Sequence, residues 1–117
     1  MKARQQMPEA MLERVAELFR ALSEPSRLRL MQALFGGEHS VGELVEASGL
    51  TQANVSKHLG VLHQAGWVTR EKRGLQVVYA LADDRAAQLC ELMCNRVQHQ
   101  LAAAAAAAGM APLRKRS

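Results

Sequence analysis

The sequence predicts a mainly α-helical fold of about five helices with one β-hairpin, a winged helix-turn-helix. Apolar residues recur at helical spacing in four segments before residue 66. Over residues 76–81 the period becomes two, which is typical of a strand, and the helical period returns after residue 83. Two short helices joined by a glycine turn and followed at once by a hairpin outline this fold.

The first two predicted helices lie before residue 36. Pro8 suits the first position of a helix that runs to about residue 22, because proline lacks only an amide that is unpaired there. A break at residues 23–26 precedes a second amphipathic segment, which ends at Gly36 and Gly37.

The next two helices form the predicted helix-turn-helix. Ser40 and Glu43 have the spacing of a capping box that starts a short helix ending at Gly49. Thr51 can cap a following helix that ends at Gly66. The inner face of that helix is expected to contain Val55, Leu59 and Leu62.

Residues 67–70 and 76–81 are the predicted strands of the hairpin, with the turn at 71–74. Asp83 and Asp84 suit the N-terminal end of a last long helix that stops at Gly109. This helix carries a narrow apolar stripe that includes Val97 and Leu101.

A chain of 117 residues suggests one domain. We place it at residues 1–109, with terminal helices for dimerisation, and expect a disordered basic tail at 110–117. The N-terminus has no apolar signal core and the longest apolar run is eight residues, so we expect a cytoplasmic protein without membrane contact. Two cysteines are too few for a disulfide framework.

The charge is uneven along the chain. Residues 1–50 hold six Lys/Arg and seven Glu, whereas residues 51–117 hold nine Lys/Arg and four Asp/Glu. A basic second half indicates an acidic partner, most simply nucleic acid.

The fourth predicted helix is the candidate DNA-reading element. Its outer or flanking positions are expected to be Gln52, Asn54, Ser56, Lys57 and His58. Such side chains contact bases and phosphates in a major groove, and no carboxylate occurs over residues 52–67 to repel the phosphates. The alternative is an ordinary solvated helix face.

A basic cluster at the hairpin tip, Arg70, Lys72 and Arg73, would add salt-sensitive contact with the minor groove or backbone. The alternative is a hairpin that charge merely keeps soluble. A reading helix and a basic wing in succession are less expected by chance than either feature alone.

The chain also resembles the ArsR/SmtB family of repressors over roughly residues 15–101. The segment ALSEPSRLRL at 21–30 is similar to the family's ALSDPTRLRIL, and QANVSKHLGVL at 52–62 matches its SxVSxHLxxL pattern. The flanks of the wing, residues 66–68 and 78–81, are similar too. The resemblance implies a homodimer joined by its first and last helices, which a chemical signal releases from double-stranded operator DNA, an imperfect inverted repeat.

The usual metal sites of that family are absent from this sequence. Ser40 and Gly42 replace its Cys-x-Cys pair, and the last helix lacks the paired Asp and His ligands. Cys90 and Cys94 remain as a possible sensor for a thiophilic metalloid or reactive sulfur species. They can equally be small apolar side chains packed in a dimer interface.

Three other functions are conceivable for this sequence. An enzyme is not expected, because there is no phosphate-binding glycine loop and no Cys–His pair on one helix face. A winged helix that only binds proteins would not need a carboxylate-free helix beside a basic wing. A DNA-binding repressor without any inducer stays open.

Overall fold

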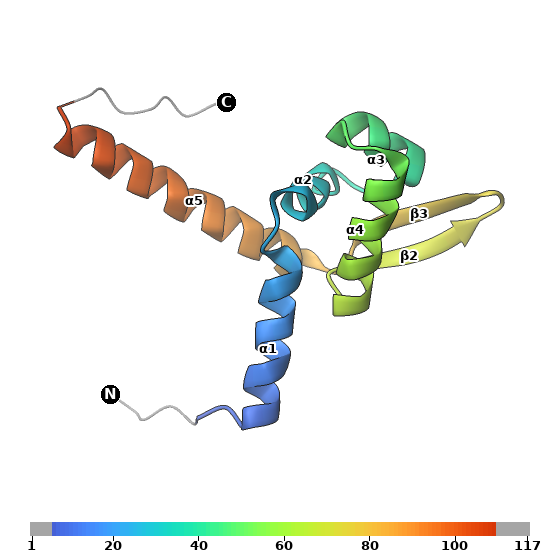
Figure 1. Cartoon of the computed structure of the whole chain (residues 1–117), viewed down its shortest axis with the longest axis horizontal. Coiled ribbons are helices and arrows are strands. Elements are labelled where there is room, and N and C mark those ends of the chain that lie inside the picture. Colours follow the sequence, from blue (N-terminus) through green and yellow to red (C-terminus); the bar gives the residue numbers. More distant parts are fainter. Residues whose placement is uncertain (1–5, 110–117) are drawn as a thin grey trace. The chain divides into compact units, whose positions relative to one another are not determined.

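The computed structural model describes residues 6–109, so the tail predicted at 110–117 lies outside the described residues. The chain forms two units that meet in sequence between Asp83 and Asp84. The first contains four helices and three strands: α1 Glu9–Leu22, α2 Pro25–Ala33, β1 His39–Ser40, α3 Val41–Ser48, α4 Gln52–Ala65, β2 Val68–Arg73 and β3 Gln76–Leu81. Figure 1 labels the helices and the two long strands. The second is the long helix α5, Asp84–Ala107. The predicted fold class of five helices and a hairpin is confirmed.

The predicted helix signals set the observed ends. Ser40 Oγ accepts the amide of Glu43 at 3.2 Å while the Glu43 carboxylate accepts the amide of Ser40 at 2.9 Å, a complete capping box. Thr51 Oγ1 accepts the amide of Asn54 at 3.2 Å and so caps α4. Pro8 differs from the prediction, because it is the residue just before α1 and not its first helical position.

The core of the first unit is aliphatic. The largest side chains in it are fully buried and come from α2 and the residue that follows it, from α3 and from α4: Leu30, Met31, Leu34, Leu44, Val55, Leu59 and Leu62. Val68 and Tyr79 bury the base of the hairpin against the helices. The inner face predicted for α4 is therefore correct, and it fixes which side of α4 is free.

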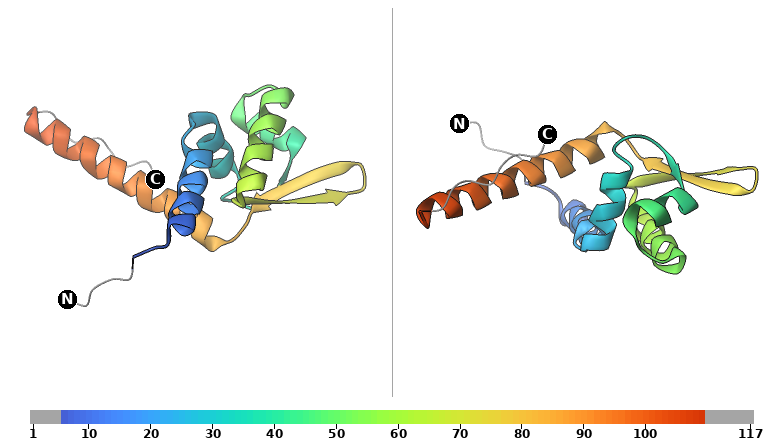
Figure 2. Two further views of the ribbon diagram at one scale, coloured as in Figure 1. Left: turned by 60° about the horizontal axis from the view of Figure 1, so that its bottom comes forward. Right: turned by 90° about the horizontal axis from the view of Figure 1, so that it is seen from above.

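The sheet has the antiparallel strand order β1-β3-β2. The hairpin is longer than predicted, because the register runs from Val68 opposite Leu81 to Arg73 opposite Gln76. Its turn is therefore Gly74–Leu75 and not 71–74, and Gly74 takes the left-handed φ of 61° that the tight turn needs. Figures 1 and 2 show the hairpin extending beyond α4.

Helix α5 presents a row of apolar side chains to solvent. They are 64%, 50%, 48% and 48% exposed and are Leu92, Met93, Val97 and Leu101. Among the described residues, no helix has the length and apolar character that a bilayer crossing requires. The row forms an exposed apolar stripe along α5 in the part of the chain that the structure describes.

Candidate DNA-binding surface

The N-terminal half of α4 carries an exposed polar face. Gln52, Asn54, Ser56 and Lys57 are all exposed, as predicted, because Val55 turns into the core between them. The first turn holds no acidic residue, so the positive end of the helix dipole is not neutralised there. The face offers amide, hydroxyl and ammonium groups to an anionic partner.

His58 is not part of this face, and its predicted outward position is wrong. It is only 8% exposed, because residues 55, 58, 59 and 62 share one side of the helix. His58 Nδ1 lies 3.3 Å from Arg27 Nη1, and His58 Nε2 lies 3.8 Å from a Glu24 carboxylate oxygen. Its role in this structure is to join α4 to the start of α2.

The hairpin divides its cations between two faces. Side chains alternate along a strand and opposite residues share a face, so Arg70 and Lys72 lie on the face of their partners Tyr79 and Val77. Both cations are exposed and have no ion-pair partner among the described residues. They extend the basic surface away from the buried base of the wing.

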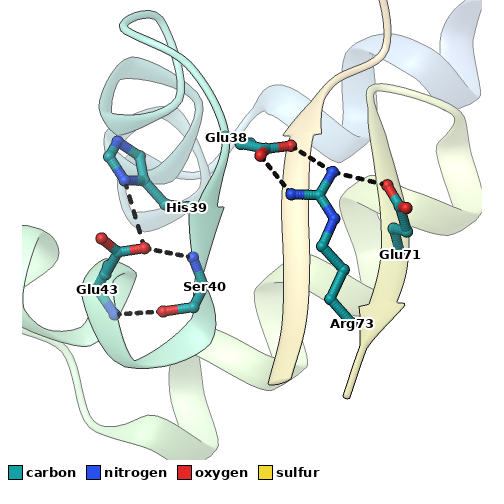
Figure 3. Close-up of polar contacts among 6 residues, drawn as sticks. All are labelled: Glu38, His39, Ser40, Glu43, Glu71 and Arg73. Atoms are coloured by element: carbon teal, nitrogen blue, oxygen red, sulfur yellow. Dashed lines mark hydrogen bonds and ion pairs between the residues drawn. The ribbon is translucent and has the colours of Figure 1, made fainter. Parts of the chain in front are cut away.

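Arg73 lies on the other face and is not a free cation, in contrast to the prediction. Its guanidinium pairs with both oxygens of Glu38 and with Glu71 at 3.0 Å (Figure 3). These carboxylates raise the pKa of Arg73, and the hydrogen bond from Arg73 lowers the pKa of Glu38. The pairing with Glu38 leaves no local signal in the sequence, because Glu38 is 35 residues away from Arg73.

A groove of about 390 Å³ lies between the start of α4 and the wing. Gln52 and Ser56 of α4 line it, and Gln76 of β3 and Leu75 of the turn line the opposite side. The sequence prediction missed Leu75 and Gln76, which a longer hairpin brings to this place. The reading helix and the wing thus border one depression lined by uncharged side chains.

The two cysteines are free and lie on α5, where Cys90 is half-buried and Cys94 is exposed. Burial raises the pKa of the Cys90 thiol, and the neighbouring Cys94 raises it further. No cluster of three or more His, Cys, Asp or Glu side chains in the described part of the chain could hold a metal ion. The pair could at most offer two sulfur ligands from one chain.

Comparison with known proteins identifies the family. Residues 24–70 match the model of the arsR family of bacterial regulatory proteins. The chain is 43% identical over 79 residues to a biofilm growth-associated repressor of Agrobacterium fabrum, covering 68% of each chain. It is 40% identical over 92 residues to the repressor SmtB of Mycobacterium tuberculosis, covering 79% of this chain and 66% of that one. A relative in Streptomyces lividans, 40% identical over 77 residues, is named "Probable mercury resistance operon repressor". The match covers 66% of this chain and spans 62% of that relative's length.

Solved structures of similar fold support the same family assignment. A homodimeric winged helix-turn-helix DNA-binding domain of Mycobacterium bovis superposes with a TM-score of 0.76 at 27% identity, covering 86% of this chain and 94% of that one. The repressor BigR of Xylella fastidiosa superposes with a TM-score of 0.64 at 40% sequence identity, covering 75% of this chain and 93% of that one. The chain belongs to the ArsR family of bacterial regulatory proteins and is a winged helix-turn-helix transcriptional regulator, not an enzyme.

Proposed function

We propose that the chain is a repressor that binds double-stranded operator DNA through α4 and the wing. The observation that carries the proposal is the exposed, carboxylate-free face of α4 beside Arg70 and Lys72, two exposed cations with no ion pair to any described residue. The major groove admits a helix, and amide side chains there read adenine in pairs of hydrogen bonds. Asn54 and Gln52 are the base-reading candidates on this face.

The remaining groups hold the phosphate backbone. Lys57 and Ser56 flank the amides on α4, and Arg70 and Lys72 extend the contact along the wing. Arg73 is left out of this set, because two carboxylates already neutralise it. The sugar-phosphate backbone of one DNA strand can pass through the depression between α4 and the wing, where Gln76 would face it.

We further propose that the repressor is a homodimer joined by α1 and α5. Helix α1 exposes Met11, Leu12 and Phe19, and α5 exposes the stripe described above. Apolar rows of this kind on two terminal helices are typical of an interface between copies. The similar domain from Mycobacterium bovis is homodimeric. Two reading helices roughly 34 Å apart would then meet an imperfect inverted repeat.

An inducer that reacts with thiols is the finer part of the proposal. Cys90 and Cys94 stand one turn apart on α5 and suit a thiophilic metalloid, such as arsenite, or a reactive sulfur species. A mercury resistance repressor is among the relatives, which supports a soft ligand. The competing possibility is a repressor without an inducer, and the partial burial of Cys90 favours that reading. Either form would act in the cytoplasm, where the operator is.

The test is binding to the DNA upstream of the chain's own gene, measured by fluorescence anisotropy against a shuffled duplex. We expect at least a thousandfold preference for the natural site. Asn54→Ala should remove about 1–3 kcal/mol of that preference, as expected for one lost pair of base contacts. Equal affinity for both duplexes would reject a sequence-specific repressor and favour a winged helix that binds proteins.

A further inference from the structure

A second groove, of about 420 Å³, lies between α1 and α4 on the first unit. It gathers three guanidinium groups and one carboxylate, with an apolar and amide wall from α4. The residues that line it are Arg14, Glu17, Arg20, Ala21, Arg27, Val61, Gln64 and Ala65. The proposed DNA and dimer contacts use none of these side chains.

Only one of the three arginines has a carboxylate partner among the described residues. Arg14 pairs with Glu17 at 2.9 Å, which uses the single carboxylate of the groove. Arg27 Nε donates to the carbonyl of Ala21 at 2.7 Å, a neutral acceptor that holds the guanidinium in place. Arg20 is exposed and has no ion-pair partner among the described residues. Two positive charges of the groove are therefore uncompensated.

We propose that this groove binds a small anion with at least two negative charges, carried by carboxylate or phosphate groups. Arginine forks bind such groups through paired, charge-assisted hydrogen bonds. The side chains of Val61 and Ala65 can cover the short body of the ligand, and the Gln64 amide can donate to it. Arg20 and Arg27 would hold its two ends.

The groove lies beside the exposed apolar side of α1 and shares no residue with it. At about 100° per residue, Leu12 and Phe19 lie roughly 140° and 160° around α1 from Glu17, and roughly 80° and 100° from Arg20. On α4, Gln64 follows Asn54 by ten residues, which is about 15 Å along the helix. The ligand site is thus separate from the face that would read bases.

Arg27 connects the groove to the reading helix. Its Nη1 lies 3.3 Å from Nδ1 of the buried His58, so the same guanidinium faces both the ligand and α4. An anion that draws Arg27 towards itself leaves a buried ring nitrogen without its donor, which is costly. We therefore expect the anion to displace α4 and to weaken DNA binding, an effect that rests on the proposed function.

Calorimetry with pyrophosphate and with citrate, on the DNA-free protein at constant ionic strength, tests the site. We expect saturable binding of at least one probe, at one ligand per chain. Arg20→Gln should weaken it about tenfold, the effect of one charge-assisted hydrogen bond. Glu17→Gln should tighten it, because it removes the carboxylate that competes for Arg14. The matched control is Arg29→Gln, an exposed arginine of α2 outside the groove, which should bind like the wild type.

The proposal is overturned if neither probe binds saturably, or if Arg20→Gln and Arg29→Gln behave alike. It is also overturned if Arg20→Gln lowers the salt dependence of DNA binding without added anion, because DNA phosphates would then occupy the groove. In a second arm, the better probe should lower DNA affinity for the wild type and not for Arg20→Gln; equal effects on both reject the coupling through Arg27. A protein that binds no duplex would refute the repressor function and leave the calorimetric result standing.

Discussion

The indole Nε1 of Trp67 donates a hydrogen bond of 2.9 Å to the main-chain oxygen of Leu18, 49 residues earlier in the sequence. This bond ties the residue that opens the wing to the last turns of α1. The angle of the wing and the position of α1 are therefore fixed together.

Replacing Trp67 by phenylalanine should lower the free energy of unfolding by about 1 kcal/mol for the lost bond, plus the loss of part of the ring contacts. The free energy of unfolding is measured by urea unfolding followed by circular dichroism, because the variant lacks the sole tryptophan and so cannot be followed by tryptophan fluorescence. Lys57→Ala, an exposed change, should stay within about 0.5 kcal/mol of the wild type. Equal stability of both variants would show that the bond contributes nothing.

The salt dependence of DNA binding should separate the cations of the wing. Lys57→Ala and Arg70→Ala should each reduce the slope of log K against log salt by about 0.9, the value for one phosphate contact. Arg73→Ala should reduce it by less, because Glu38 and Glu71 already compensate that charge. If Arg73→Ala reduced this slope more than Arg70→Ala, the hairpin face that carries Arg73 would be the one that contacts DNA.

An acidic group in the stripe of α5 should break the dimer. Val97→Asp places a carboxylate where we expect a second copy to pack, and an unpaired buried charge is strongly unfavourable. Sedimentation should show a monomer for Val97→Asp and a dimer for Gln98→Asp, which adds the same charge at the next exposed position. A Val97→Asp dimer would place the interface elsewhere.

If the cysteines sense a signal, Cys90→Ser/Cys94→Ser should no longer release operator DNA when arsenite, cadmium or polysulfide is titrated. The raised pKa of Cys90 sets the pH behaviour: its thiolate is scarcer at neutral pH than that of an ordinary thiol, so its reaction must accelerate as pH rises. Burial, the larger cause, remains in Cys94→Ser, which retains Cys90 alone, so its alkylation rate should still be climbing above the ordinary cysteine pKa of about 8.5. A wild type that ignores every reagent would leave both cysteines as packing residues.

Local signals predicted most of the fold. The capping box at Ser40, the cap at Thr51 and the glycines at 49 and 66 each act within a few residues, and the structure has all four. The two-residue strand β1 has no period to detect, and only its pairing with β3 creates it. The predicted hairpin is too short, because the charged run 70–73 suggests a turn in the sequence, whereas cross-strand pairing extends β2 through these residues.

The misplaced site residues share one cause. His58 and Arg73 belong to polar types that commonly face solvent, and the partners that hold them, Arg27 and Glu38, are 31 and 35 residues away. Tertiary contacts of that separation leave no periodic trace in the sequence. Gln52, Asn54, Ser56 and Lys57 were placed correctly because helical period alone determines their side of α4.

Strand β2 forms one margin of the sheet, since β3 lies on its inner side and no strand pairs beyond it in the described chain. Its outer backbone groups are therefore free to pair with another β-strand, the usual start of aggregation. Four successive charged residues, 70–73, occupy this margin and discourage such pairing. The wing's charge thus opposes edge-to-edge pairing in addition to making this surface basic. Mutants neutralised along the whole strand should associate edge to edge, so weak DNA binding by such mutants must be checked against light scattering.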